Sequence, residues 1–442
     1  MPLVLAAEWR FMKRKNGLIK LLAFVAVLVL SIGSLTSCLL WLPSGDDADY
    51  MTEDEVRELI SGSMGGDVTI DEVNEYDITI NNQGQSNLAA ATKGVLSAVS
   101  VRCSFKVKVG YTDKTVTETS SGAGVIYKLD KTKGDAYVIT NYHVVYSANA
   151  TQNKISNDIK LYLYGMEGHD YSDNPDKYAI PATFVGGSLT EDLAVLKVTG
   201  SRTLAESNAT AVTFADSNDV SILDTAIAIG NPAAGGISAT VGCVNVDGEY
   251  VNITGADERT PVELCLLRID TAVNSGNSGG GLFNDKGELI GIVNAKIVSS
   301  DIDNIAYAIR SNAVRAVVEN ILHYCDGKSA ENPYKYAIGI KMQVTGQSTV
   351  FDESDGRVHR REVVAVSDVT SGTVAAELFR KGDVINSITI NGKTYTINRM
   401  FQVIDAMYNV YEGSTLSVSV TRDGETVTVE VPVSQMTLNK VS

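Results

Sequence analysis

At residues 274–281 the chain reads Asn-Ser-Gly-Asn-Ser-Gly-Gly-Gly, which places Ser278 among glycines between two apolar, strand-like runs. Glycine allows backbone turns that other residues cannot adopt, and it leaves room for a second backbone to approach. Such a turn can aim amide N–H groups at one point beside a serine hydroxyl, as acyl transfer requires. The strand-like runs on both sides favour an ordered turn over a flexible Gly/Ser-rich loop.

Two further polar residues stand at the ends of predicted strands upstream of Ser278. His143 follows the apolar run 137–140, and Asp192 comes directly before the apolar run 193–198. Alone, each is compatible with a structural role, because a hydrogen-bonded histidine or a turn aspartate is common. Together they supply a general base, a carboxylate that orients it, and a nucleophile. We therefore predict a catalytic triad of His143, Asp192 and Ser278.

The region around these residues is rich in short β-branched and apolar runs separated by Gly, Asn, Asp and Ser. This pattern, from residue 95 to residue 309, predicts an all-β barrel or sandwich. It closes with a predicted helix that begins at Ser311 and carries apolar residues at helical spacing. A smaller module of about 100 residues follows Pro333 and ends in a hairpin at Asp423-Gly424.

The segments 140–145, 191–198, 276–282 and 287–292 closely resemble those of the HtrA/Deg family of trypsin-like serine proteases. The resemblance implies a mainly β fold: a chymotrypsin-like double β-barrel with the active site between the barrels, followed by a PDZ domain. On this basis we assign residues 93–326 to the protease domain and residues 334–433 to the PDZ-like domain.

The resemblance also implies roles for single residues. Ser278 would attack the scissile carbonyl, His143 would transfer the proton, and Asp192 would hold the histidine in one tautomer. The backbone N–H groups of Gly276 and Ser278 would form the oxyanion hole. The PDZ loop that binds peptide C-termini would comprise Tyr336, Ala337, Ile338, Gly339 and Ile340.

Departures from the family pattern concern specificity more than chemistry. The segment 293–296, expected to line the substrate cleft, is unusual, and no acid stands at Ala272, near the expected base of the S1 pocket. We expect cleavage of polypeptide substrates after small aliphatic residues rather than after Arg or Lys. Homotrimers are usual in the family, but no residue pattern here indicates the oligomeric state.

The N-terminus carries a membrane signal. Within the cytoplasmic segment 1–20, the basic residues Lys13, Arg14, Lys15 and Lys20 precede an apolar run, 21–42, that is long enough to span a bilayer. Bases before it and acids after it place the rest of the chain on the extracytoplasmic side, in a bacterial envelope. We expect a retained single-pass transmembrane helix. The alternative is cleavage before Cys38, because 35–38 resembles a lipoprotein box with Cys38 as the lipidated residue.

Acidity is concentrated after this apolar run. The formal net charge is −16, and residues 46–92 contain twelve acidic residues against a single base, Arg57. With few aromatic residues, the stretch 43–92 is predicted to be a linker. The remainder has no basic patch that would indicate nucleic-acid binding.

No cofactor is predicted. The four histidines are scattered, no H-E-x-x-H string occurs, and Leu322 stands where a phosphate loop ending at 327–329 would need glycine. None of the five cysteines forms a C-x-x-C pair. Cys243 and Cys265 flank a predicted hairpin that could carry a disulfide, but buried free thiols are the favoured interpretation.

The motifs together predict a membrane-anchored serine endopeptidase for quality control of misfolded or exposed envelope proteins. The competing hypothesis is a regulatory scaffold or chaperone, in which the PDZ module binds peptides while the protease domain is idle.

Overall fold

The computed structural model describes residues 83–110, 112–167, 176–294, 305–325, 332–353 and 356–441. These lie in the second of two compact units, 80–442. The predicted anchor 21–42, Cys38 and most of the predicted linker lie outside the described residues. Among the helices that are described, none combines the length and the apolar character needed to cross a bilayer.

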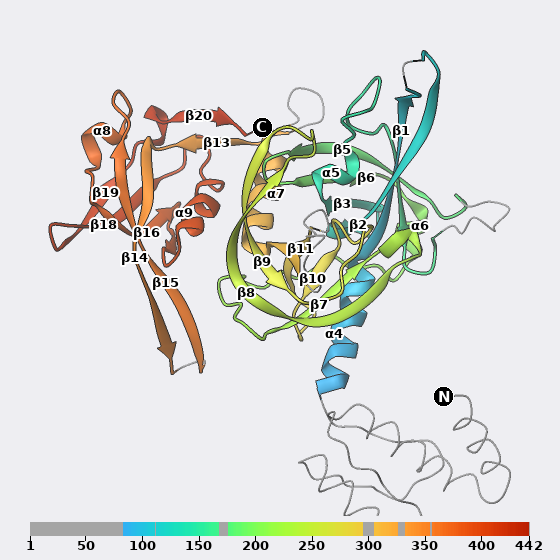
Figure 1. Cartoon of the computed structure of the whole chain (residues 1–442), viewed down its shortest axis with the longest axis horizontal. Helices are drawn as coiled ribbons and strands as arrows, with labels where there is room; N and C mark the ends of the chain where they lie inside the picture. The colour runs from blue at the N-terminus through green and yellow to red at the C-terminus, as the bar shows by residue number, and fades with distance from the viewer. Residues whose placement is uncertain are drawn as a thin grey trace, which may run out of the picture. The chain divides into compact units, whose positions relative to one another are not determined.

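The first six strands close into a barrel in the order β1-β2-β3-β6-β5-β4 (Figure 1). Inward residues alternate with outward ones along β1, where Val99, Val101, Cys103 and Phe105 are buried, as expected for strands with one face on a core. The strands are β1 (Ala98–Lys108), β2 (Thr115–Asp130), β3 (Asp135–Thr140), β4 (Asp158–Leu163), β5 (Ile180–Ser188) and β6 (Leu193–Val198).

The next six strands close a second barrel in the order β10-β11-β12-β9-β8-β7. They are β7 (Thr225–Gly230), β8 (Ser238–Thr254), β9 (Pro261–Ile269), β10 (Gly281–Phe283), β11 (Leu289–Val293) and β12 (Ala306–Arg310). Every residue of β10 and β11 is buried, which explains why these strands read as continuous apolar runs rather than as alternating ones. The prediction of a double β-barrel is therefore confirmed, and each barrel has six strands.

Helices occupy the outside and the connections of the barrels. The predicted helix after the last strand is α7 (Ser311–Tyr324), whose buried side includes Val314, Val317 and Ile321. The short helices are α5 (Tyr142–Val145), α6 (Arg202–Glu206) and η1 (Pro232–Ala234).

The helix α4 (Gln83–Ser97) was not expected from the sequence. The predicted strand from residue 95 instead begins at Ala98, because the preceding turn of α4 packs on the second barrel. Ala90 is buried there, and Gly94 lies so close to Ile229 and Phe283 that a Cβ would approach within 2.4 Å of Ile229 Cδ1.

The C-terminal module has its own apolar core and two sheets. One sheet pairs β13 with β20; the other has the order β14-β15-β16-β18-β19, with β17 paired to β16. Its elements are β13 (Tyr334–Ala337), β14 (Ile340–Asp352), β15 (Arg357–Val369), α8 (Ala375–Leu378), β16 (Val384–Ile390), β17 (Lys393–Thr396), α9 (Met400–Met407), β18 (Leu416–Arg422), β19 (Glu425–Glu430), η2 (Val433–Gln435) and β20 (Thr437–Lys440).

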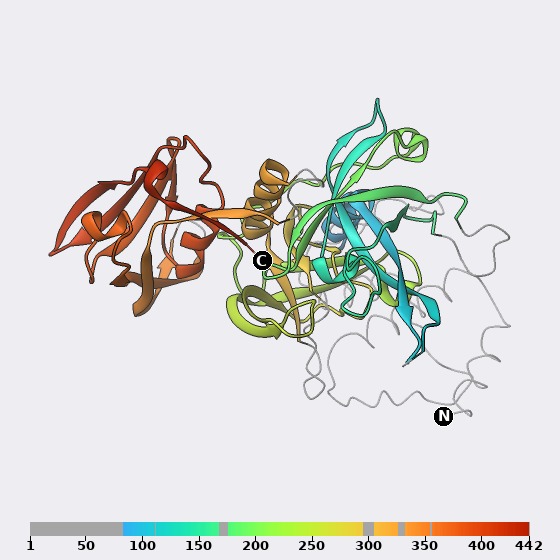
Figure 2. The same cartoon turned by 90° about the horizontal axis from the view of Figure 1, so that it is seen from above.

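The polar segment 346–361 forms most of a long antiparallel hairpin between β14 and β15, which projects from this module in Figure 1. The α7 helix lies on the side of the barrels next to this module (Figures 1 and 2).

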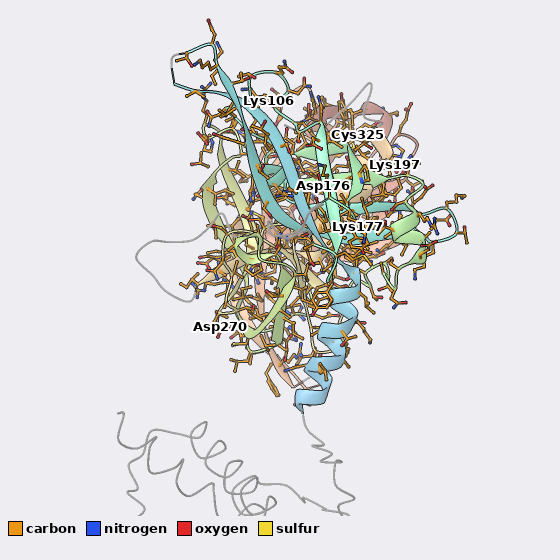
Figure 3. The ribbon with its side chains drawn as sticks, turned by 90° about the vertical axis from the view of Figure 1, so that its right-hand side faces the viewer. Lys106, Asp176, Lys177, Lys197, Asp270 and Cys325 are labelled. Atoms are coloured by element: carbon orange, nitrogen blue, oxygen red, sulfur yellow. The ribbon has the colours of Figure 1, made fainter. Side chains whose placement is uncertain are left out.

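The four described cysteines are free. Cys243 does not reach Cys265; its thiol donates to Asp270 Oδ2 at 3.3 Å. Cys325 is buried at the end of α7. Figure 3 shows it well apart from Asp270, the residue that the Cys243 thiol contacts. All four are therefore free thiols as predicted, but only Cys103 and Cys325 are buried; Cys243 and Cys265 are partly exposed.

Candidate active site

Strand pairing brings two of the predicted triad residues together at one end of the first barrel. β3 and β6 are antiparallel neighbours, with Thr140 opposite Ala194. His143 follows the end of β3, inside α5, and Asp192 directly precedes the start of β6. The two side chains therefore lie side by side although 49 positions separate them in the chain.

The histidine and the aspartate are joined by two hydrogen bonds. His143 Nδ1 lies 2.7 Å from Asp192 Oδ2, and the His143 backbone N–H donates to Asp192 Oδ1 at 3.0 Å. Asp192 is 4% exposed. Because a carboxylate can only accept, Nδ1 carries the proton, and Nε2 of the neutral ring is left as a proton acceptor. This is the tautomer that a general base beside a serine needs.

A third group, Asn294, also contacts this carboxylate. Its Nδ2 donates to Asp192 Oδ2 at 2.9 Å, and the residue is fully buried. Asn294 follows β11 in the second barrel, so this bond crosses between the two barrels. Sequence reasoning placed 293–296 beside the substrate cleft but did not predict this contact.

Replacing Asn294 by alanine is expected to lower kcat by between about tenfold and a hundredfold, with little change in KM. The substitution removes one charge-assisted hydrogen bond from the buried carboxylate that orients His143. Steady-state kinetics on a quenched peptide would measure both parameters. The matched control is Asn386→Ala, since Asn386 bonds Thr421 within the C-terminal module. Equal losses of kcat in both variants would contradict the role of Asn294 in holding the Asp192 carboxylate.

The serine turn packs directly against the first barrel. The Ser278 carbonyl accepts from Ala123 N at 2.8 Å. At Gly279, φ is +84°, and a Cβ there would lie 2.3 Å from both the Ala123 carbonyl oxygen and Thr140 Oγ1. Only glycine fits this close approach. The contact sets Ser278 next to the strand end that leads to His143, although no hydrogen bond joins Ser278 Oγ to His143 within the described part of the chain.

The geometry of the turn bears on the predicted oxyanion hole. The Ser275 carbonyl accepts from Ala233 N at 2.8 Å. In a trans peptide the N–H points opposite to the C=O, so the Gly276 N–H is directed away from Ala233. Among the described residues, neither Gly276 N nor Ser278 N donates to a protein acceptor. The oxyanion hole of Gly276 and Ser278 therefore stays a prediction, and no described contact occupies either donor.

Asn231 supports this turn, although the sequence analysis assigned it no role. Its Nδ2 donates to Ser121 Oγ at 3.1 Å and its Oδ1 accepts from Gly236 N at 2.9 Å. The loop that holds the Ser275 carbonyl is thereby attached to β2.

Among the described residues near the expected S1 pocket, the acid closest to Ala272 in the sequence is already hydrogen-bonded. Ala272 is held through its carbonyl by Thr240 Oγ1 at 2.9 Å. The nearest acid in the sequence, Asp270, accepts from Cys243 N at 2.7 Å, and this bond lowers the pKa of its carboxyl.

The predicted PDZ loop divides between core and surface. Tyr336 and Ile338 are buried in the core of the module, whereas Ala337 is exposed. Gly339 has a φ of +97°, and its carbonyl accepts from Thr370 N at 2.8 Å. Ile340 begins β14. The loop residues therefore form a tight turn between β13 and β14.

Two closed six-stranded barrels with this His-Asp pair and glycine-rich serine turn define a serine endopeptidase of the trypsin-like class. Comparison with known proteins agrees: residues 122–292 match the trypsin-like peptidase domain, and residues 337–433 match the PDZ domain. No metal-binding cluster occurs among the described residues.

Similar curated proteins extend over most of the chain. A serine protease Do-like HtrA of Lactococcus lactis subsp. cremoris is 28% identical over 86% of this chain and 95% of its own length. One from Lactococcus lactis subsp. lactis is 31% identical, covering 72% of each chain. The periplasmic serine endoprotease DegP of Escherichia coli K12 is 30% identical over 72% of this chain and 58% of its own length. The chain belongs to the HtrA family of serine proteases.

Proposed function

We propose that this chain is a membrane-anchored endopeptidase that hydrolyses misfolded or exposed polypeptides through His143, Asp192 and Ser278. The observation that carries the proposal is the 2.7 Å contact between His143 Nδ1 and Asp192 Oδ2 beside a serine turn packed on the same barrel. The extracytoplasmic location in a bacterial envelope follows from the basic segment 1–20 and the apolar run 21–42.

In the proposed reaction Ser278 Oγ attacks the scissile carbonyl carbon while His143 Nε2 accepts its proton. The proton then passes to the departing amine, and water attacks the acyl-enzyme by the same route. The N–H groups of Gly276 and Ser278 would bind the oxyanion, each stabilising the transition state by about 3 to 4 kcal/mol. Peptide C-termini would add as a strand beside the turn 338–340.

Labelling with a fluorophosphonate probe tests this function directly. We expect the full chain in detergent to take up the probe, and peptide mapping to locate the adduct on Ser278. The His143→Ala variant is expected to remain unlabelled, because its serine lacks a base. An unlabelled wild-type chain, tested also with added hydrophobic C-terminal peptides, would favour the scaffold hypothesis instead.

A further inference from the structure

Tyr408, which caps the C-terminal end of α9 in the PDZ domain, is packed among residues of the protease domain. It is 1% exposed and belongs to the same apolar cluster as Leu193 of β6 and Val317 of α7. Its backbone carbonyl accepts from the buried Asn320 Nδ2 at 2.9 Å. Most other buried apolar residues of the PDZ domain form a separate core. Tyr408 is therefore held on the protease side by both its ring and its backbone.

A buried charge pair attaches the same helix one turn earlier. Arg310, at the end of β12, is 2% exposed, and its Nη1 lies 2.9 Å from Asp405 Oδ2. The geometry is that of an ion pair rather than an aligned hydrogen bond. The Arg310 guanidinium also stacks 3.6 Å from the centroid of the Phe401 ring. Side chains at 401, 405 and 408 share one helix face, so α9 presents one continuous face to the protease domain.

The Tyr408 hydroxyl donates to Glu191 Oε1 at 2.6 Å. Burial raises the pKa of the Glu191 carboxyl, while the bond from Tyr408 and the charge of Lys335 act in the opposite direction. Glu191 is partly buried, and removing the hydrogen-bond donor from its carboxyl would leave that polar group unsatisfied, which is costly. Glu191 therefore depends on Tyr408 to keep its present position.

Glu191 is the residue immediately before Asp192, in the turn between β5 and β6. Ser188 Oγ accepts from Glu191 N at 3.1 Å, and the Asp192 carbonyl accepts from Asn141 Nδ2 at 2.8 Å. Asp192 itself has a φ of +49°, a left-handed conformation that persists only where surrounding contacts determine it. One of the contacts that define this turn comes from the PDZ domain.

We infer that Tyr408 is a positioning residue for the protease: by holding Glu191, it keeps Asp192 in the conformation that orients His143. The active site is thus complete only when α9 is docked. This inference rests on the proposed function. A wild-type chain without activity would refute the function, whereas an active wild type with an unaffected Tyr408 variant would refute only the inference.

The test is Tyr408→Phe in the full chain, assayed on a quenched peptide with an aliphatic P1 residue. We expect kcat to fall about tenfold, the size of one lost hydrogen bond to an ionisable group, with KM within a factor of about two. Glu191→Gln alone is expected to lower kcat less than Tyr408→Phe does, because the amide oxygen still accepts from the phenol. In the Tyr408→Phe background, Glu191→Gln should restore part of the lost kcat, because a neutral amide is less costly to leave unpaired.

The matched control is Tyr250→Phe. Tyr250 is a partly buried tyrosine on β8 whose hydroxyl has no partner among the described residues, so its loss should leave kcat unchanged. Thermal unfolding of each variant reports folding. A folded Tyr408→Phe variant with wild-type kcat, or one whose loss Glu191→Gln does not reduce, overturns the inference. If Tyr408→Phe does not fold, Glu191→Ala replaces it: the same tenfold loss supports the inference, and unchanged kcat overturns it.

Discussion

Replacing Ser278 by alanine is expected to lower kcat by about a millionfold, because the attacking oxygen is lost while the rest of the site stays in place. His143→Ala should cause a loss of similar size. The double variant should be little worse than either single one, since nucleophile and base act as one unit. Casein digestion and single-turnover cleavage of a quenched peptide would measure these rates.

The same turn provides the control for this prediction. Ser275 is exposed three residues before Ser278, and only its carbonyl takes part in the contact with Ala233. Ser275→Ala should therefore retain activity within a few-fold. If Ser275→Ala loses as much activity as Ser278→Ala, the choice of nucleophile is wrong. Losses at Ser278 and His143 that multiply in the double variant would show that the two residues do not act together.

Replacing Asp192 by asparagine is expected to lower kcat by about four orders of magnitude while leaving the fold intact. The asparagine side chain is of similar size, but its amide group no longer fixes the proton on His143 Nδ1. The ring can then present a protonated Nε2 to Ser278 and cannot accept its proton. Steady-state kinetics together with thermal unfolding would separate this loss from a loss of stability.

Asp257→Asn is the control for Asp192→Asn. Asp257 accepts hydrogen bonds from Thr260 in a surface turn, where they lower the pKa of its carboxyl. This substitution should leave kcat unchanged at neutral pH. An Asp192→Asn variant with kcat within tenfold of wild type would show that the observed 2.7 Å contact does not determine the rate.

The local pattern of apolar and polar residues was sufficient to predict most of the barrel strands and the helix α7. The apolar periods of strands and helices repeat within a few residues, so a window of about 5 to 15 residues is enough to predict these elements. The local pattern did not predict α4. Small residues of this helix, such as Ala90 and Gly94, are required by close packing on the second barrel, which the local sequence does not show. The local pattern also did not predict the hairpin at 346–361, because a hairpin with two mostly exposed faces has no apolar alternation to indicate it.

By itself, the sequence determined the class of chemistry: His143, Asp192 and Ser278 stand at strand ends in short motifs whose residue types define nucleophile, base and orienting acid. Tertiary structure alone decided which groups hold them. Asn294 reaches Asp192 across 102 positions, and Tyr408 reaches Glu191 across 217. A hydrogen bond over such separations leaves no local pattern, because it depends on how barrels and domains pack rather than on the neighbours of either residue.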